Sequence, residues 1–345
     1  MSDDSLVNIP FEVDATEHGS RADVFLSRRI KRMSRSVAAE IIRIGNFKRE
    51  GGLPVRKPSE RVRTGDRLFL RRKPLVEKPT DDIELPVVYE DEHLLAVNKP
   101  GGLVVHPTAS AFHRTLIRVL RARRPEEYLT LAHRLDKETS GVMLLCKTEV
   151  ADVAIKDDFA FRRVKKAYRA IVVGVVEADE FVVDAPLRLA PDSFTSCLME
   201  TGGEGAAPAV TDVSVIARGR QATLVEARPR TGRQHQIRVH LAHVGHPIIG
   251  DKLYLGDEEL LMRALGEDLD QDTVAGLVGH WRQALHAECL ILRHPISGEE
   301  TTIRAPTPDD LVALAARYGI PAAPEAGAEA PMHGDLGPNE GFEDS

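Results

Sequence analysis

The sequence predicts an α+β protein. We expect a large domain built on a mixed, mostly antiparallel β-sheet with flanking helices, preceded by a small N-terminal α+β domain. Two observations carry this prediction. Short β-rich runs alternate irregularly with a few helical patterns and show no strand–helix–strand rhythm, which favours an antiparallel sheet. Basic residues gather near the N-terminus of an otherwise acidic chain, which indicates a separate unit there.

The bulk composition is that of a globular protein. The chain has 345 residues, of which 42% are hydrophobic and 29% charged. No apolar run is long enough to predict a transmembrane helix, and the first residues lack the basic and apolar regions of a secretory signal. Cys146, Cys197 and Cys289 stand far apart in apolar contexts, so we expect buried thiols in a reducing compartment. These features predict a cytoplasmic protein with no membrane contact, and a monomer is the default expectation.

The net charge of −7 conceals a basic segment. Residues 18–73 carry 17 Lys or Arg and 5 Asp or Glu, whereas residues 1–17 carry five acids and no Lys or Arg. A compact basic segment on an acidic chain is typical of phosphate binding. A solvated basic face would have the same composition, so charge alone leaves both interpretations open.

The small domain is predicted over residues 18–73, after the acidic segment 1–17 and before a proline-rich linker at 74–85. Apolar residues at helical spacing predict two short helices, with Ser34 or Ser36 as the N-cap of the second and Gly45 at its end. A short strand, a Gly-Asp turn and an alternating strand are expected over residues 61–73.

The large domain is predicted over residues 86–318. It should contain strands near 142–146, 168–176, 210–216 and 222–227, and helices near 113–124, 149–161, 234–244 and 307–318. Residues 257–280 hold seven acids and one base and look like an acidic insertion of helical character. Residues 319–345 are rich in Ala, Pro, Gly and acids, which predicts a disordered acidic tail.

Asp136 is the first candidate for chemistry. It lies in the stretch "AHRLDKETSGVMLLCKT", two residues after Arg134 and just before an apolar strand. Partial burial would raise the pKa of this carboxyl, whereas a nearby guanidinium would hold it ionised and oriented. Such a carboxylate suits nucleophilic or general-base chemistry. A turn carboxylate that caps backbone N–H groups near Thr139 would show the same pattern.

The segment "RPRTGRQHQIRVHLAHVGHPIIGDKLY", residues 228–254, is the second candidate. Its arginines and a predicted helix, for which Thr231 is a candidate N-cap, indicate a phosphate or carboxylate site. Its histidines raise the alternative of a zinc site, but no H-E-x-x-H pattern is present. We therefore expect no metal, and histidines that hydrogen-bond within a packed helix. The histidines concerned are His235, His240, His243 and His246.

Two further stretches complete the candidates. Tyr168 is predicted to begin an apolar strand directly after two lysines. The pattern fits a site residue and, equally well, a strand-edge tyrosine with a solvated hydroxyl. Lys99 begins a Lys-Pro-Gly-Gly turn in which the glycines allow close backbone approach. The G-x-x-x-x-G-K-[ST] and G-x-G-x-x-G patterns are absent, which argues against nucleoside triphosphate and dinucleotide chemistry.

Together and in order, these motifs resemble those of the RluA-type RNA pseudouridine synthases. The resemblance spans roughly residues 86–306, and the H-R-L-D and T-G-R-x-H-Q-I-R blocks are its most specific parts. It is carried by "NKPGGLVVHP" (98–107), "HRLDKETSGVMLLCKT" (133–148), "KAYRAIVVG" (166–174), "TGRQHQIRVHLAHVGHPIIGDKLY" (231–254) and "HAECLILRHPISGEE" (286–300).

The resemblance implies isomerisation of uridine in structured RNA, without a metal or organic cofactor. It implies that Asp136 is the catalytic aspartate, that Tyr168 stacks on the base and assists proton removal at carbon 5, and that Arg233 pairs with the aspartate. Arg134 would displace the target base and occupy its place, at a cost of a few kcal/mol for unstacking that its contacts offset. The other substrate-binding residues expected are His133, Thr139, Arg238 and Lys99.

Residues 18–73 resemble the alpha-L RNA-binding module that a ribosomal protein shares with many RNA-modifying enzymes. The match lies in Arg21–Leu26, Ser34–Ser36 and Thr64–Asp66, while "NFKREGGLPVRKPSE" departs from the usual Val-Asn-Gly turn. The RNA-contacting residues expected there are Arg21, Arg35, Lys48 and Arg49. Ribosomal RNA is the expected partner, with transfer RNA as the alternative.

In the large domain, residues 200–211 lack the Gly-Lys-x-Ala-x-Thr-like stretch of relatives. A non-catalytic RNA-binding protein of the same fold and a zinc hydrolase are the competing hypotheses.

Overall fold

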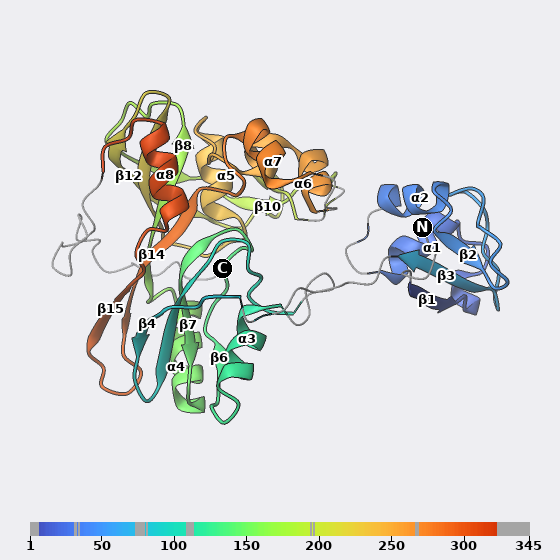
Figure 1. Cartoon of the computed structure of the whole chain (residues 1–345), viewed down its shortest axis with the longest axis horizontal. Helices are drawn as coiled ribbons and strands as arrows, with labels where there is room; N and C mark the ends of the chain where they lie inside the picture. The colour runs from blue at the N-terminus through green and yellow to red at the C-terminus, as the bar shows by residue number, and fades with distance from the viewer. Residues whose placement is uncertain are drawn as a thin grey trace.

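The computed structural model describes residues 7–322 apart from 31–32, 34, 73–79, 81, 108–113, 194, 196 and 266–268. These residues form a small N-terminal unit, which contains one sheet, and a larger body, which contains two (Figure 1). Most of the predicted tail, from residue 323 on, and most of the predicted linker lie outside the described residues, whereas Ile320 packs in the core of the large body.

The N-terminal unit is a three-stranded sheet with the order β1-β3-β2, packed on two helices. Strand β1 (Val7–Glu12) pairs antiparallel with β3 (Arg67–Arg72), and β2 (Phe47–Arg49) pairs with the other edge of β3. The predicted boundary at residue 18 is therefore wrong. Ile9 and Phe11 alternate along β1 and pack on the unit's core, so the acidic segment 1–17 contributes a strand. The expected strand at 61–63 is reduced to a single bridge between Arg61 and Arg21.

The two helices of this unit are α1 (Ala22–Arg29) and α2 (Arg35–Arg43), as the apolar spacing predicts. Gly45 follows α2 with φ +78°, which confirms it as the residue that ends the helix. Ser36 lies inside the first turn of α2, so its prediction as the N-cap is wrong. Ser34 lies outside the described residues.

The large body is organised by a ten-stranded sheet, and the predicted mostly antiparallel α+β architecture is confirmed. Its order is β4-β5-β7-β14-β8-β13-β12-β9, with β15 on β14 and β6 on β7. Only the pair β7–β14 is parallel among the described strands of this sheet. The strands are β4 (Val87–Glu90), β5 (Leu94–Lys99), β6 (Thr130–Leu131), β7 (Ser140–Cys146), β8 (Lys165–Val173), β9 (Glu180–Asp184), β12 (Val210–Arg218), β13 (Ala222–Pro229), β14 (Leu285–Arg293) and β15 (Glu300–Arg304).

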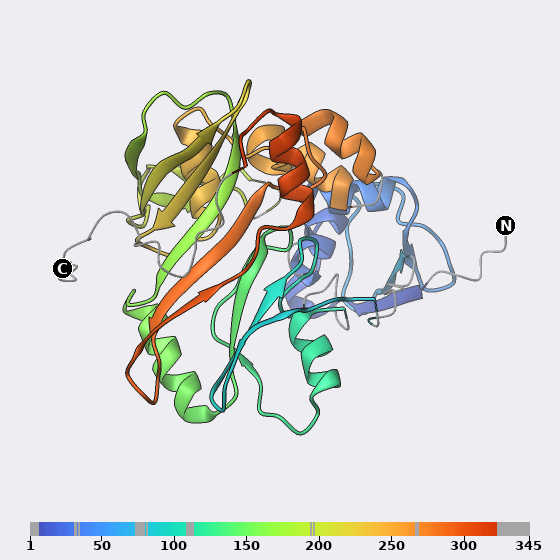
Figure 2. The ribbon, with the colours of Figure 1, turned by 60° about the vertical axis from the view of Figure 1, so that its left-hand side comes forward.

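Helices cover both faces of the sheet where β5 and β7 lie (Figures 1 and 2). Along these strands successive side chains enter different cores, one with α3 (Leu116–Arg123) and one with α4 (Glu149–Ala160). This explains why β7 is buried at every position and reads as a continuous apolar run. In the other half of the sheet, α5 (Gln236–His243) and α8 (Asp309–Arg317) pack on a core that includes β8 and β13.

The remaining elements of the large body lie beside the half of the sheet that α5 covers. A small second sheet pairs β10 (Leu187–Leu189) with β11 (Met199–Thr201), and a π-helical turn, η2 (Lys252–Gly256), follows α5. The helical character predicted for residues 257–280 is confirmed by α6 (Glu258–Leu265) and α7 (Gln271–Val278). The N-terminal unit also contains the short turn η1 (Ala15–Glu17).

Gly141 allows the close approach of β14 to β7, directly after the turn that holds Asp136. It has φ +117°, and a Cβ atom there would lie 2.1 Å from the carbonyl oxygen of Ala287. We expect Gly141→Ala to lower the free energy of unfolding by about 3 kcal/mol, because backbone atoms must move. Urea unfolding midpoints at constant m-value would measure the loss.

Gly276→Ala is the matched control for this prediction. Gly276 lies inside α7 and a Cβ atom there would meet nothing within 4 Å, so alanine should be neutral or stabilising by up to about 1 kcal/mol. An unchanged midpoint in Gly141→Ala would contradict the assignment of this glycine to close packing.

The described part of the chain contains no helix long and apolar enough to cross a membrane. The expected burial of Cys146 and Cys289 is confirmed, whereas Cys197 is only partly buried. All three are free thiols.

Candidate active site

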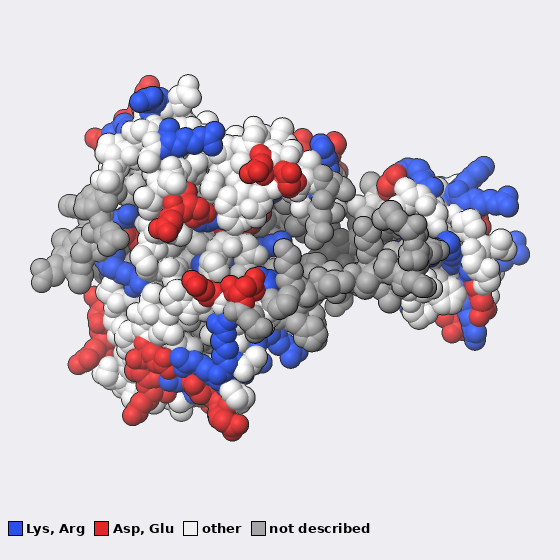
Figure 3. All heavy atoms as spheres, in the orientation of Figure 1, with Lys and Arg blue, Asp and Glu red and all other residues white. Residues whose placement is uncertain are grey.

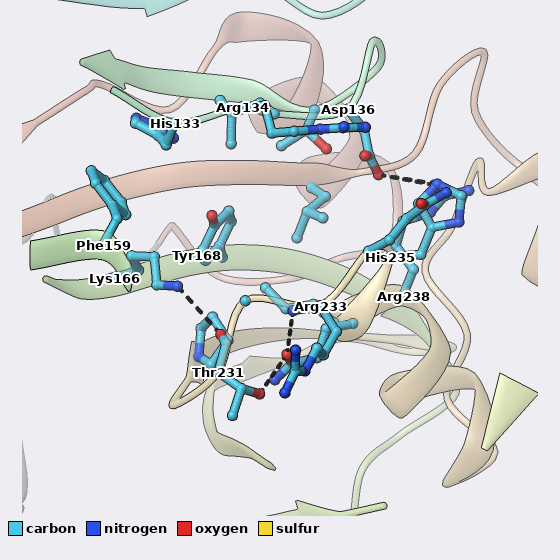
Figure 4. Close-up of a pocket in the computed structure, with 18 of the residues that line it drawn as sticks. His133, Arg134, Asp136, Phe159, Lys166, Tyr168, Thr231, Arg233, His235 and Arg238 are labelled. Carbon is cyan, nitrogen blue, oxygen red and sulfur yellow. Dashed lines mark hydrogen bonds and ion pairs between the residues drawn. The ribbon is translucent and has the colours of Figure 1, made fainter. Parts of the chain in front are cut away.

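A cavity of about 430 Å³ opens where the two halves of the large sheet meet. Its walls come from the turn at 132–139, the end of α4, the start of β8, the loop at 229–235 and α5 (Figure 4). Of the stretches predicted to carry catalytic or substrate-binding residues in the large domain, all except the Lys-Pro-Gly-Gly turn contribute to these walls. A volume of this size accommodates a nucleoside-sized ligand.

Asp136 lies at this cavity, at the end of the turn between β6 and β7. Its side chain is 27% exposed, so it is shielded but open to a ligand. The turn closes on itself through the bond from Thr139 N to the Asp136 carbonyl (3.2 Å). Gln283 fastens it further, donating to Thr139 Oγ1 (2.7 Å) and Asp136 Oδ2 (3.5 Å). Asp136 is thus positioned by elements far apart in the sequence.

Lys99 does not reach the cavity, so its prediction as a substrate-binding residue is wrong. Its side chain is fully buried, and Nζ donates to the carbonyl oxygens of Pro100, Leu103 and Lys137 at 2.8–3.0 Å. Burial, followed by the charge of Arg282, lowers the pKa of Lys99 to about 7. The lysine therefore fastens the turn that carries Asp136 to the turn at 99–103.

Arg238, on α5, is the basic residue that forms an ion pair with Asp136. The prediction that Arg233 pairs with Asp136 is therefore wrong. Arg238 Nη1 lies 2.9 Å from Asp136 Oδ2. Arg233 lies on the exposed loop before α5, where its Nε donates to the Pro208 carbonyl at 3.2 Å. The physical reason is burial: Arg238 lies in the buried first turn of α5 and is 8% exposed, whereas Arg233 precedes the helix and is exposed.

Asp251 is a site residue that the motif analysis missed. Its side chain is fully buried and binds Arg238 with both oxygens, at 2.7 Å to Nε and 2.9 Å to Nη2. The same guanidinium lies 5.0 Å from the ring centroid of Tyr254. Asp251 also caps η2 by accepting from Leu253 N and Tyr254 N. Arg238 is therefore held in one orientation before any substrate arrives. The Gly-Asp-Lys-Leu-Tyr block was the signal available in the sequence.

The charge on Asp136 is maintained by this arrangement. Burial alone would raise the pKa of Asp136, but His235 and the ion pair with Arg238 outweigh it and hold the pKa below its usual value. Burial, followed by the charge of Arg238, lowers the pKa of His235 to about 4, so this ring is neutral at pH 7. Arg238 is consequently the charge that keeps Asp136 ionised near neutral pH.

His235 is a neutral ring beside Asp136 at pH 7. It is the N-cap of α5 and adopts φ +55°, a left-handed conformation that is uncommon outside glycine. Its Nδ1 lies 2.9 Å from Tyr254 Oη, which itself accepts from Met199 N and can donate to the ring. The other ring nitrogen, Nε2, lies 3.8 Å from Asp136 Oδ2, which is beyond hydrogen-bond distance.

Tyr168 presents its ring to the centre of the cavity (Figure 4). Burial, followed by the charge of Asp136, raises the pKa of its hydroxyl above the usual value. The hydroxyl therefore stays protonated at neutral pH and is a weak base. The position of the ring in the cavity fits the expected stacking on the base, and the assistance of Tyr168 in removing the carbon-5 proton stays a prediction.

The other predicted contacts take different positions. Arg134 lines the cavity and is exposed, and in the described part of the structure its guanidinium makes no hydrogen bond or ion pair. His133 stacks on Phe159 with ring centroids 5.0 Å apart, and its Nε2 accepts from Leu144 N. Thr139 lines the cavity but is occupied by Gln283. Thr231 is not the N-cap of α5, because its hydroxyl donates to Gln236 Oε1 instead.

The histidines after His235 are each engaged separately. His240 is buried and binds Thr211 Oγ1 and the Ala185 carbonyl, while His246 Nδ1 lies 2.9 Å from the Val173 carbonyl. His243 Nδ1 lies 3.1 Å from Thr201 Oγ1. Within the residues described, no group of three or more His, Cys, Asp or Glu side chains is placed to hold a metal ion.

In the N-terminal unit, three of the four predicted RNA-contacting residues form ion pairs within the unit. Arg21 and Arg35 both bind Asp23, and Arg49 binds Glu60 and Asp66. Other basic side chains project from the outer end of the unit (Figure 3). The exposed ones include Arg28, Arg43, Arg56, Lys57, Arg61, Arg63 and Arg67.

The cavity suits an enzyme that acts on RNA, because it surrounds one carboxylate with cations in a chain whose net charge is −7. Its charged lining consists of Asp136 and of Arg134, Arg162, Lys166, Arg233 and Arg238. Comparison with known proteins agrees with this class. Residues 93–243 match the family model described as RNA pseudouridylate synthase.

The chain belongs to the RluA-type family of RNA pseudouridine synthases, and it is therefore an isomerase that acts on RNA. It is 39% identical over 304 residues to ribosomal large subunit pseudouridine synthase D of Xylella fastidiosa, covering 86% of this chain and 88% of the relative. It is 34% identical over 313 residues to the protein of the same name from Pseudomonas aeruginosa, covering 89% and 93%.

Solved structures show the same fold. Human RNA pseudouridylate synthase domain containing 1 aligns with a TM-score of 0.55 at 26% identity, covering 72% of this chain and 93% of that one. Human RNA pseudouridylate synthase domain containing 4 aligns with a TM-score of 0.54 at 30% identity, covering 69% and 94%.

Proposed function

We propose that this protein converts uridine to pseudouridine in the RNA of the large ribosomal subunit, with Asp136 as the group that acts on the ribose. The names of the relatives support the choice of RNA. The observation that carries the catalytic assignment is the ion pair of Asp136 with Arg238, which keeps a partly exposed carboxylate charged at the cavity. Ribosomal RNA as the substrate would also place the protein in the cytoplasm.

The reaction balances without an external reactant. The bond between N1 of uracil and C1′ of ribose breaks, the base turns, and a bond forms between carbon 5 and C1′. Carbon 5 loses its proton and N1 gains one. Asp136 either attacks C1′ or removes a sugar proton as the first bond breaks, and both routes need an ionised carboxylate. Arg238 supplies that ionisation, and the Tyr168 ring supports the detached base while it turns.

The target uridine has to leave its stack to reach this cavity, at a cost of a few kcal/mol. We propose that Arg134 offsets part of this cost, because its guanidinium is exposed beside Asp136 and uncommitted within the described structure. A planar guanidinium can stack on bases and contact phosphates. The N-terminal unit adds phosphate affinity that does not depend on sequence, through its exposed arginines and lysines.

The test of this function is tritium release from RNA labelled at uridine carbon 5. Large-subunit RNA from cells that lack the gene would be treated with the purified protein, and RNA from cells that have the gene would serve as the modified control. Release from the first RNA and none from the second is expected. Binding without release from any RNA would instead support a non-catalytic RNA-binding protein.

We expect kcat/KM to be flat between about pH 5 and 7 and to fall only at lower pH. The pKa of Asp136 lies below its usual 3.8, so the carboxylate is present above that value and is lost as the pH falls through the lowered pKa. His235, with a pKa of about 4, adds no step near neutral pH. Single-turnover rates across this range, with far-UV circular dichroism to confirm folding, would check the profile. An acid limb centred near pH 6 would contradict it.

A further inference from the structure

The connection between α4 and β8 carries two cations, Arg162 and Lys166, to which the reaction above assigns no role. Both line the cavity, together with Phe159. In Figure 4, Lys166 and Phe159 lie on the other side of Tyr168 from Asp136. Lys166 and Tyr168 are two apart on β8, so their side chains share the face of the strand that meets the cavity.

Neither cation has an acidic partner among the described residues. Lys166 Nζ donates to the Thr231 carbonyl at 3.3 Å, and the guanidinium of Arg162 makes no hydrogen bond or ion pair within the described part of the structure. Asp136, the carboxylate in the described cavity lining, is already paired with Arg238. Burial, followed by the charge of Arg162, lowers the pKa of Lys166 to about 8. Lys166 is partly buried and Arg162 is exposed beside the same cavity, and two like charges that border one cavity are stabilised by an anion between them.

The backbone at Arg162 is an independent sign of function. Arg163 N donates to Asp158 O and Arg162 N to Phe159 O, which is the pattern of a Schellman ending of α4. Arg162 occupies its left-handed position, with φ +58°, where glycine is the usual residue. A long charged side chain at this position costs stability. Strain of this kind is commonly retained where the side chain has a function.

We propose that Arg162 and Lys166 form a binding site for a backbone phosphate of the RNA strand next to the target uridine. This inference rests on the proposed function, because it takes the cavity's substrate to be RNA. The site lies beside the Tyr168 ring on the side away from Asp136, so it would hold the flanking strand while the uridine occupies the centre. The chemistry recognised is one phosphodiester anion, bound by a guanidinium and an ammonium group.

The same segment offers a charge-matched control. Arg163 is ion-paired with Asp158, and Lys165 is exposed at the position of β8 that points away from Lys166. Neither lines the cavity. The variant Arg163→Gln/Lys165→Gln therefore removes two positive charges within a few residues of the proposed site without touching it.

The experiment compares Arg162→Gln/Lys166→Gln with this control on RNA from the large subunit. We expect KM to rise about tenfold to a hundredfold with kcat nearly unchanged, because the phosphate contact is equal in ground and transition states. The slope of log binding constant against log salt concentration should fall by about 0.7, the value for one phosphate contact to a single strand. The control should change the slope by much less. Equal slopes in the two variants, or a fall in kcat at constant KM, would overturn the proposal.

A second variant separates binding from folding. Arg162→Gly should raise Tm, because glycine relieves the left-handed strain, and should raise KM at the same time. An increase in Tm with an unchanged KM would show that the arginine makes no contact with RNA. Replacing the phosphates that flank the mapped uridine by neutral methylphosphonates, one at a time, supplies the chemical counterpart. One such neutral linkage should weaken RNA binding by the wild type and leave RNA binding by Arg162→Gln/Lys166→Gln unchanged.

The two proposals fail in different ways. If the wild type releases no tritium from any RNA, the proposed function fails, while the salt dependence of binding still tests the phosphate site. If release is normal and the salt slope is insensitive to Arg162 and Lys166, the phosphate site fails alone.

Discussion

Asp136→Asn is expected to lower kcat for tritium release by about 10⁴-fold or more. The amide has nearly the shape of the carboxylate, but it can neither attack C1′ nor remove a sugar proton. RNA binding should stay within a few-fold of the wild type, because Asp136 is one of many lining residues and carries the wrong charge to attract phosphate. The fold should survive as well, since Arg238 keeps its two contacts with Asp251.

Single-turnover release under saturating enzyme is the measurement, with binding followed separately by filter retention. Asp157→Asn is the matched control, because Asp157 is an exposed carboxylate on α4 outside the cavity lining. Equal rates for the wild type and Asp136→Asn would remove this carboxylate from the chemistry. Glu138 would not replace it, because that carboxylate is occupied by Lys252 at 2.6 Å.

Arg238→Gln is expected to lower both activity and stability. Without the guanidinium, the fully buried Asp251 and the partly buried Asp136 have lost their common counter-ion. Leaving a buried charge without its partner costs about 3–5 kcal/mol of unfolding free energy. The pKa of Asp136 should rise, so the acid limb of kcat/KM should move toward neutral pH. Urea unfolding and the pH profile of the variant would measure the two effects.

Arg233→Gln is the comparison that decides between the arginine expected from the motif and the one seen in the structure. Arg233 is exposed, and its hydrogen bond within the described structure goes to one carbonyl oxygen. Its loss should change stability by less than about 0.5 kcal/mol and leave the acid limb in place. A moderate rise in KM is expected, because the side chain lines the cavity. An acid limb that moves in Arg233→Gln and not in Arg238→Gln would return the pairing role to Arg233.

Local pattern was enough to place most elements of the large domain. The predicted strands at 142–146, 168–176, 210–216 and 222–227 and the helices near α3, α4, α5 and α8 agree with the structure within three residues at each end. These elements have strong apolar periodicity or continuous apolar runs, and their ends carry turn residues. The errors lie where pattern is weak: β1 has six residues in an acidic segment, and it becomes a strand only because β3 offers an edge.

For the candidate site too, local pattern predicted some residues and missed others. The sequence placed Asp136 and Tyr168 correctly at the cavity, because each lies in a distinctive block, Asp136 in the turn before β7 and Tyr168 within β8. The expectation that Tyr168 begins its strand is wrong, since β8 begins at Lys165. It could not tell whether Arg233 or Arg238 reaches the carboxylate, since both lie in one motif five residues apart. It could not foresee that Lys99 is enclosed by three carbonyl oxygens.

The sequence by itself determined the fold class, the family and the presence of one distinctive carboxylate, because these depend on residue types and spacing along the chain. Only the tertiary structure decided which cations serve which purpose. Arg238 and Gln283 reach Asp136 from segments more than 100 residues away, and Asp251 holds Arg238 in place. Arg162 and Lys166 meet the cavity through the turn after α4. The physical reason is that the energy of a charge depends on its burial and its partners, which are set by packing between distant segments.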